Sequence, residues 1–261
     1  MSISKPFFVL GPCALEKEEL GWEVANAVKA MADELDFELI FKASYDKANR
    51  TSVDSFRGLG VKEGTKILGD IGKNLGVKVT TDVHTAKEAE IAAENVDILQ
   101  IPAFLCRQTD LLEAACKTGR IVNVKKGQFL APWDVQNIVE KLQAFGCEQS
   151  YITERGTTFG YNNLVADMRS LYWMRKEGIK VIFDATHSVQ RPGGLGGTTG
   201  GDGELAPVLA SCAVAAGVDG VFMETHPNPL KALSDGPNQI PLADMPAVLK
   251  KLLAIAQVAH S

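Results

Sequence analysis

The sequence lacks paired cysteines, a basic tail and any apolar run long enough to cross a membrane. Its five cysteines are scattered, odd in number and without a Cys-x-x-Cys motif, which excludes a disulfide scaffold and fits a reducing compartment. The formal net charge is −5, and no zinc-finger spacing or basic patch indicates binding to nucleic acid. The N-terminus carries no cleavage signature. We therefore expect a cytoplasmic protein that binds neither nucleic acid nor membrane.

Two common phosphate-binding signatures are also absent. No apolar run is followed by Gly-x-Gly-x-x-Gly, which disfavours an open, doubly wound sheet. The glycine-rich segment 193–203 lacks the Gly-Lys-Ser/Thr of a P-loop. That segment is either a lid over an active site or a surface loop without function, and the sequence leaves both interpretations open.

Short apolar runs rich in Val, Ile, Leu and Phe recur along the chain and alternate with helical patterns. The runs lack polar alternation, so both faces should be buried, as in a parallel sheet. They cover 7–12, 38–44, 78–83, 98–104, 121–125, 150–154, 180–185 and 220–224. Helices are expected at 16–35, 62–75, 86–94, 109–118, 133–145, 162–177, 205–216 and 243–258. This α/β pattern predicts a single-domain (β/α)8 TIM barrel spanning residues 1–261, since such barrels need about 250 residues.

Cationic side chains stand at the ends of several predicted strands. In barrels of this kind the chemistry takes place at the C-terminal ends of the strands. A lysine flanked by apolar strand residues is costly to bury unless an anion meets it. The cations in such positions are Lys42, Lys47, Lys125 and Arg155. They predict a pocket for a small phosphate or carboxylate ester. The alternative is that they form internal salt bridges with Asp82, Glu154 and Asp184.

A second group of side chains combines the ligand types of a metal site. Cys13, His187 and Glu224 each end an apolar run, and Asp235 follows in the loop beyond the last of them. A thiolate, an imidazole and two carboxylates suit Zn²⁺, Fe²⁺, Mn²⁺ or Co²⁺ better than Mg²⁺ or Ca²⁺. The alternative is structural: a small buried thiol, two hydrogen-bonding side chains and an aspartate that begins a turn.

Long motifs give this chain a resemblance to a known family. They are Gly11–Glu16, Phe41–Arg50, Ser55–Gly58, Thr80–His84, Gln100–Leu111, Asn123–Phe129, Thr153–Leu164, Asp184–Gln190 and Phe222–Asp235. Over nearly its whole length the chain resembles the 3-deoxy-D-manno-octulosonate 8-phosphate (KDO 8-phosphate) synthase family. The resemblance implies a condensation of phosphoenolpyruvate with D-arabinose 5-phosphate and water, which gives KDO 8-phosphate and inorganic phosphate for lipopolysaccharide biosynthesis.

The resemblance also implies roles for individual residues. Family members with Cys at the position of Cys13 depend on a divalent metal, and the implied ligands are Cys13, His187, Glu224 and Asp235. The positions implied for phosphoenolpyruvate are Lys42, Lys47, Lys125 and Arg155, with Gln100 beside them. Those implied for the sugar phosphate are Asn49, Arg50 and Thr51, where the family commonly has Ser in place of Thr51. A homotetramer is implied, with 47–51 near a subunit boundary.

The resemblance and the chemistry together indicate a catalytic set. It comprises Cys13, Lys47, Asp82 and His187. Asp82 and His187 are both candidates for handling protons or ordering water, and the sequence does not decide between them. The segment 193–203 is more glycine-rich than we expect of the family, which leaves its part in closing the site open.

Two other functions remain as alternatives. A sister synthase condenses phosphoenolpyruvate with erythrose 4-phosphate in aromatic biosynthesis and shares the barrel and the ligand types. Its sugar-phosphate motif resembles Lys-Pro-Arg-Thr-Ser, whereas Asn49 stands in the corresponding segment here and favours the five-carbon sugar. A non-catalytic barrel that binds a phosphorylated metabolite would need the cationic pocket but not the metal ligands.

Overall fold

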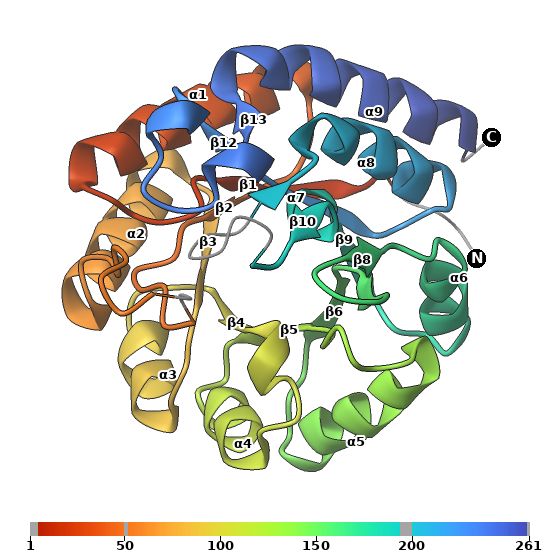
Figure 1. Ribbon diagram of the computed structural model, residues 1–261. Coiled ribbons are helices and arrows are strands. Elements are labelled where there is room, and N and C mark those ends of the chain that lie inside the picture. The colour runs from red at the N-terminus through yellow and green to blue at the C-terminus, as the bar shows by residue number, and fades with distance from the viewer. Residues whose placement is uncertain (1–4, 50–51, 194–199, 260–261) are drawn as a thin grey trace.

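The expected apolar runs all form strands that pair in parallel. The computed structural model describes residues 5–49, 52–193 and 200–259. Its barrel strands are β1 (Phe7–Gly11), β2 (Leu39–Lys42), β3 (Lys78–Asp82), β4 (Ile98–Ile101), β5 (Ile121–Lys125), β6 (Ser150–Glu154), β9 (Val181–Asp184) and β12 (Gly220–His226). They pair in that order, and β1 pairs with β12 to close the barrel (Figure 1). The predicted (β/α)8 architecture is confirmed.

Helices surround this barrel on its outside (Figure 1). They are α1 (Glu18–Leu35), α2 (Val61–Leu75), α3 (Ala86–Ala93), α4 (Thr109–Lys117), α5 (Gln136–Ala144), α6 (Arg169–Lys176), α8 (Ala206–Ala215) and α9 (Met245–Ala259), with the single turn α7 (Ala185–Ser188) after β9. On α1 the expected stripe of Leu20, Val24 and Val28 is buried. No helix among the described residues is long and apolar enough to span a bilayer.

The apolar core has two parts. Alternate residues of a strand face opposite sides of the sheet, so Phe8 and Leu10 pack with the helices while Val9 faces the barrel interior. The interior cluster joins Val9, Ile40, Ile98, Ile182 and Phe222. The buried polar residues gather at the C-terminal ends of the strands. The apolar layer therefore serves as a floor beneath a polar mouth.

Local turn chemistry overrides part of the sequence pattern after β6. The helix expected at 162–177 begins later, at Arg169, because the chain first forms the antiparallel ribbon β7 (Thr157–Thr158) and β8 (Leu164–Val165). Asn162 lies in the turn of this ribbon with φ +53°, a left-handed conformation that ends any helix. The prediction of a helix from residue 162 was therefore wrong by about two turns.

Further short elements carry loops of the mouth. The ribbon of β10 (Gln190–Arg191) and β11 (Gly200–Gly201) follows β9, and β13 (Ile240–Pro241) pairs in parallel with the end of β12. Asp235 precedes the 3-10 turn η5 (Gly236–Asn238) with φ +48°. Most of the glycine-rich segment 193–203 lies outside the described residues, as do Arg50 and Thr51.

Candidate active site

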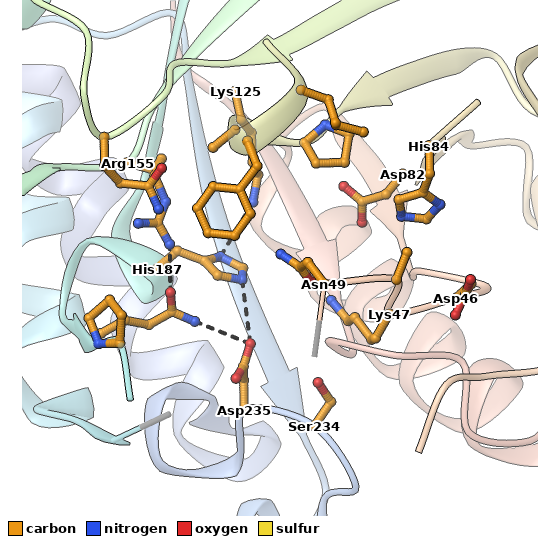
Figure 2. Close-up of a pocket in the computed structure, with 18 of the residues that line it drawn as sticks. Asp46, Lys47, Asn49, Asp82, His84, Lys125, Arg155, His187, Ser234 and Asp235 are labelled. Carbon is orange, nitrogen blue, oxygen red and sulfur yellow. Dashed lines mark hydrogen bonds and ion pairs between the residues drawn. The ribbon is translucent and has the colours of Figure 1, made fainter. Parts of the chain in front are cut away.

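A cavity of about 390 Å³ opens at the C-terminal ends of the barrel strands. Figure 2 shows Lys125, Arg155 and His187 on one side of it and Lys47 and Asn49 on the other. The predicted site residues that line it are Lys42, Lys47, Asn49, Asp82, Lys125, Arg155, His187 and Asp235. Side chains from strands far apart in sequence thus converge on one pocket.

Two of the pocket lysines are paired with buried carboxylates. Lys42 Nζ lies 2.7 Å from Glu224 Oε1, and Lys125 Nζ lies 2.7 Å from Asp184 Oδ2. The ring of Phe222 lies beneath both lysines, with its centre 4.3 Å from Lys125 Nζ and 5.3 Å from Lys42 Nζ. These lysines therefore line the cavity and also form internal salt bridges, so the two arrangements do not exclude each other.

Arg155 differs from these lysines in its partners. Its side chain is buried, and Nη2 donates a hydrogen bond to Gln190 Oε1 at 2.5 Å. Within the described parts of the chain, no carboxylate lies within salt-bridge distance of Arg155, and the buried Nη1 has no partner. Burial lowers the pKa of this guanidinium. A buried donor without an acceptor is costly, so this corner of the pocket favours a bound anion.

A belt of hydrogen bonds crosses the mouth below the cavity. Thr153 donates to Asn123 at 2.8 Å, Asn123 to Gln100 at 2.9 Å, and Gln100 to Asp82 at 2.7 Å. Ser44 donates to the other oxygen of Asp82. Both ends of the Gln100 amide are thus engaged inside the belt, and Gln100 is absent from the cavity lining. Its described contacts are those of a support for Asp82.

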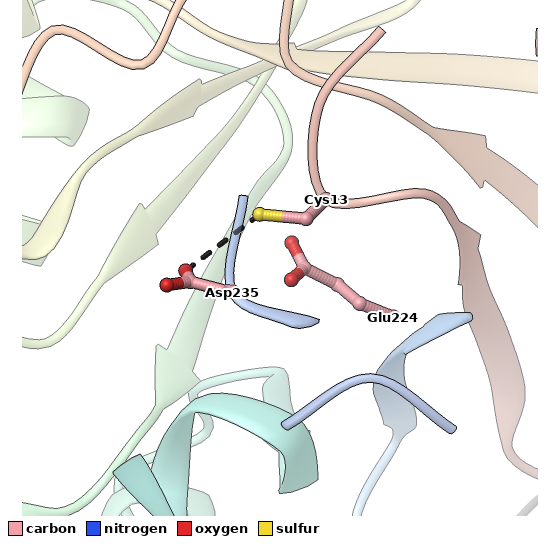
Figure 3. A group of neighbouring side chains, drawn as sticks. All are labelled: Cys13, Glu224 and Asp235. Carbon is pink, nitrogen blue, oxygen red and sulfur yellow. Dashed lines mark hydrogen bonds between the residues drawn. The ribbon is translucent and has the colours of Figure 1, made fainter. Parts of the chain in front are cut away.

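Three of the four predicted metal ligands form one group, and the fourth, His187, lies beside it. Donor atoms of Cys13, Glu224 and Asp235 all lie within 4.8 Å of one another (Figure 3). His187 Nε2 lies 3.6 Å from Glu224 Oε2 and 3.9 Å from Asp235 Oδ2, and Cys13 Sγ lies 3.6 Å from Asp235 Oδ2. Tetrahedral zinc bonds of about 2.0–2.3 Å separate donor atoms by roughly 3.3–3.8 Å. The spacing of Cys13, Glu224 and Asp235 is compatible with one transition-metal ion, and His187 lies beside this group without belonging to it.

The surroundings of His187 and Cys13 fit the same ion. His187 Nδ1 lies 2.8 Å from Asp184 Oδ2, a contact that leaves Nε2 directed at the other ligands, as in many metal-binding histidines. Burial, and then the charge of Glu224, raise the pKa of the Cys13 thiol well above its usual value. The thiol is therefore protonated without a metal, and a cation would displace its proton.

Some side chains of the site were not predicted from the sequence. Gln190 and Ser234 line the cavity, and Ser234 Oγ lies 3.2 Å from Cys13 Sγ. Each adjoins a predicted residue or motif, since Gln190 ends the 184–190 motif and Ser234 precedes Asp235. His84, at the end of the 80–84 motif, also lines the cavity. Their position in or next to those motifs is the feature of the sequence that could have identified them as site residues.

A cationic pocket beside a thiol, an imidazole and carboxylates, at the C-terminal mouth of a parallel barrel, is the arrangement of a (β/α)8-barrel enzyme. Residues 4–258 match the DAHP synthetase I family, to which this chain belongs. The chain is 57% identical over 256 residues to the 2-dehydro-3-deoxyphosphooctonate aldolase of Geobacter metallireducens, with 98% of this chain and 94% of the relative covered. It is 56% identical over 257 residues to the protein of that name from Nitratidesulfovibrio vulgaris strain DP4, with the same coverage. With the Cyanothece protein of that name the identity is 55% over 252 residues, and 96% and 92% are covered.

Proposed function

We propose that this chain condenses phosphoenolpyruvate with D-arabinose 5-phosphate and water to give KDO 8-phosphate and inorganic phosphate. The observation that carries the proposal is the near full-length identity with enzymes named 2-dehydro-3-deoxyphosphooctonate aldolase. The name 2-dehydro-3-deoxyphosphooctonate is another name for KDO 8-phosphate. The cationic pocket supports the assignment, because both reactants are phosphorylated anions.

In the proposed reaction, side chains of the pocket hold and orient phosphoenolpyruvate. Lys42, Lys125 and Arg155 offer donors from three different strands or strand ends, which fixes the direction of the enol ester. C3 of phosphoenolpyruvate attacks the aldehyde carbon, and water adds at C2. The tetrahedral intermediate then expels inorganic phosphate by C–O cleavage. Cations around the leaving group stabilise the charge that develops on it.

We propose that Cys13, His187, Glu224 and Asp235 hold a divalent transition metal, of which Zn²⁺, Fe²⁺, Mn²⁺ and Co²⁺ fit the ligand types. When bound, such an ion would supply a Lewis acid for the aldehyde oxygen. His187 would then have one ring nitrogen on the metal and the other near Asp184. Its part in catalysis is therefore that of a ligand, not of a proton carrier.

Asp82 is the better candidate for ordering the water. Burial alone would raise its pKa, but Lys42, Lys47 and Lys125 hold the pKa well below its usual value. The group is therefore ionised at neutral pH and can accept a hydrogen bond, but it cannot donate a proton. Ser44 and Gln100 fix both oxygens of the carboxylate.

A comparison of two aldose phosphates as substrates tests the assignment. Purified protein is given phosphoenolpyruvate with either D-arabinose 5-phosphate or D-erythrose 4-phosphate, and phosphate release is measured with and without a chelator. We expect turnover with the five-carbon sugar that is lost on chelation and restored by Zn²⁺ or Mn²⁺. Turnover with erythrose 4-phosphate alone would overturn the assignment, and binding without turnover would favour a non-catalytic barrel.

We further propose a homotetramer, with the 47–51 segment near a subunit boundary. Large aromatic side chains are exposed around the mouth, and such side chains are enriched in subunit interfaces. They are Phe104, Phe129, Trp133 and Phe159. Light scattering on the purified protein measures the assembly. We also propose a cytoplasmic location, because all five cysteines are free, as is usual for proteins of a reducing compartment.

A further inference from the structure

Gln190 contacts both halves of the site with one side chain. It lies in β10, and its side chain is buried. Its Oε1 accepts a hydrogen bond from Arg155 Nη2 at 2.5 Å, and its Nε2 donates to Asp235 Oδ2 at 3.1 Å. A neutral amide thus bridges the cation of the anion pocket and one of the candidate metal ligands.

The two neighbours fix the direction of this amide. A guanidinium can only donate hydrogen bonds, and an ionised carboxylate can only accept them. The carbonyl of Gln190 must therefore face Arg155, and its NH₂ group must face Asp235. No other orientation satisfies both neighbours, so the amide can hold each of them in place.

The neutral charge of Gln190 matters for Arg155. Lys42 and Lys125 each lie 2.7 Å from a carboxylate that offsets their charge, Glu224 and Asp184 respectively. Arg155 has no such carboxylate partner among residues 5–49, 52–193 and 200–259, and its Nη1 is buried without an acceptor. An amide oxygen orients the guanidinium without neutralising it. The full positive charge stays available to a bound phosphate or carboxylate.

The donor group of Gln190 matters for Asp235. The Cys13 thiol also lies near Asp235 Oδ2, at 3.6 Å, but a thiolate bound to a metal can no longer donate. The Gln190 NH₂ group keeps its donor on metal binding. Asp235 has φ +48°, a conformation that a non-glycine residue adopts at a cost and keeps only when its surroundings hold it. Hydrogen bonds to ligating carboxylates of this kind orient them toward the ion.

We propose that Gln190 is a positioning residue, which orients Arg155 for the substrate anion and Asp235 for the metal ion. The inference rests on the proposed function, because it takes phosphoenolpyruvate as the anion and a divalent transition metal as the ion. It extends that function to a residue that acts through its two neighbours, Arg155 and Asp235.

Two substitutions test the two contacts, each with its own binding measurement. Gln190→Met removes both hydrogen bonds at similar volume, and we expect Zn²⁺ affinity of the metal-free protein to fall 10- to 100-fold in competition with a chromophoric chelator. Gln190→Glu is nearly isosteric and places a carboxylate against Arg155. We expect phosphoenolpyruvate binding, measured by calorimetry without aldose, to weaken about 10-fold or more, because the guanidinium charge is neutralised.

Arg191→Met is the matched control. Arg191 is the next residue of β10, is exposed and pairs with Asp202 across 2.9 Å, so this variant weakens the same ribbon without touching the amide. We expect both affinities to stay within about 2-fold of wild type, since exposed pairs contribute little. Equal losses in Arg191→Met would show that ribbon stability, not the amide, supports the site, and would overturn the inference.

The remaining outcomes are also decisive. If wild type binds both probes and the Gln190 variants bind them equally well, Gln190 has no positioning role. If wild type binds neither Zn²⁺ nor phosphoenolpyruvate, the proposed function fails and the inference fails with it. Near-ultraviolet circular dichroism shows whether each variant is folded before binding is measured. If Gln190→Met does not fold, the nearly isosteric Gln190→Glu still tests the inference.

Discussion

The Lys42 ammonium and the Glu224 carboxylate lie 2.7 Å apart inside the barrel, with side chains only 1% and 2% exposed. This pair joins the cationic pocket to the candidate metal ligands, and Lys42 also donates to the carbonyl oxygen of Cys13 at 3.1 Å. Burial alone would raise the pKa of Glu224, but His187 and Lys42 hold the pKa well below its usual value. Glu224 therefore stays ionised when no metal is bound.

Replacing Lys42 tests how the pair and the metal share this charge. In the metal-free protein, Lys42→Met leaves Glu224 buried without its nearest cation, and we expect the free energy of unfolding to fall by about 3–5 kcal/mol. Saturating Zn²⁺ should recover part of that loss, because the ion supplies positive charge beside the same carboxylate. Urea unfolding with and without Zn²⁺ measures both effects.

The control for that experiment is a lysine whose pair is exposed. Lys29 and Asp33 form an i,i+4 pair on α1 at 2.5 Å, and we expect Lys29→Met to cost less than about 1 kcal/mol and to be insensitive to Zn²⁺. Equal destabilisation by the two substitutions would contradict the prediction that Lys42 stabilises the fold by compensating the charge of the buried Glu224.

Cys13 is predicted to be indispensable for the metal. Cys13→Ala removes the thiolate ligand, so we expect the purified protein to lose its metal on gel filtration and most of its phosphate-releasing activity. Cys212, an exposed residue of α8, supplies the control, because Cys212→Ala removes a thiol that is not one of these ligands. Metal content and activity are measured on both variants. Retention of metal and activity by Cys13→Ala would refute the proposed ligand role.

Repeated short apolar runs predict the barrel because parallel strands are buried on both faces and therefore read as continuous hydrophobic segments. Element boundaries are harder, since they depend on local turns. Thr109 shows this, because threonine is a common N-cap residue, yet here it is the first helical residue and Gln108 precedes it at the cap position. The Thr109 hydroxyl instead accepts a hydrogen bond from Lys141 at 2.7 Å, a contact between separate helices.

The chemistry of the site is only partly visible in the sequence. Cys13, His187 and Glu224 can be recognised in the sequence, because polar or reactive side chains are uncommon at the ends of apolar strands unless they have a function. Gln190 does not, since an amide has no distinctive reactivity and its importance comes from its two neighbours. The sequence predicted that Gln100 lies beside the substrate, but both ends of its amide form hydrogen bonds within the belt, to Asp82 and Asn123. The roles of Arg50 and Thr51, outside the described residues, stay predictions.

Asp82 gives the protein a defined sensitivity to acid. The three lysines near it lower its pKa on folding, despite burial, below the value of about 3.9 in an unfolded chain. A lowered pKa stabilises the fold above the unfolded pKa, and that contribution disappears as the pH falls through the folded pKa. We therefore expect the urea concentration at the unfolding midpoint of the metal-free protein to decrease as the pH falls below about 4. Asp82→Asn should make this decrease with pH less steep.

The same series at neutral pH gives the other half of this test. Asp82→Asn should be less stable than wild type at pH 7, and the difference should narrow toward pH 3. Asp33→Asn, at an exposed carboxylate on α1, should leave the slope unchanged. An unaltered pH slope in Asp82→Asn would mean that other carboxylates carry the acid sensitivity.

Arg57 is predicted to protect the pocket from a misplaced negative charge. Its Nε and Nη2 each donate to the Asp46 carboxylate at 2.6 Å, and its carbonyl oxygen accepts from the Lys47 amide at 2.7 Å. Asp46 lines the cavity, so removal of the guanidinium leaves a bare carboxylate where phosphorylated anions must enter. We expect Arg57→Ala to raise the KM values for both substrates on the order of 3- to 10-fold, with a smaller effect on kcat.

A second substitution separates charge from backbone support. If the unpaired Asp46 carboxylate is the cause, Asp46→Asn in the Arg57→Ala background should restore most of the wild-type KM, because the repelling charge is gone. High salt should also shrink the defect of Arg57→Ala, since Asp46 is partly exposed and its field is screened. Steady-state kinetics at low and high ionic strength measure both effects. A double variant that is no better than Arg57→Ala would rule out the charge of Asp46 as the cause. It would point instead to a displaced backbone around residue 57, whose carbonyl oxygen accepts from the Lys47 amide.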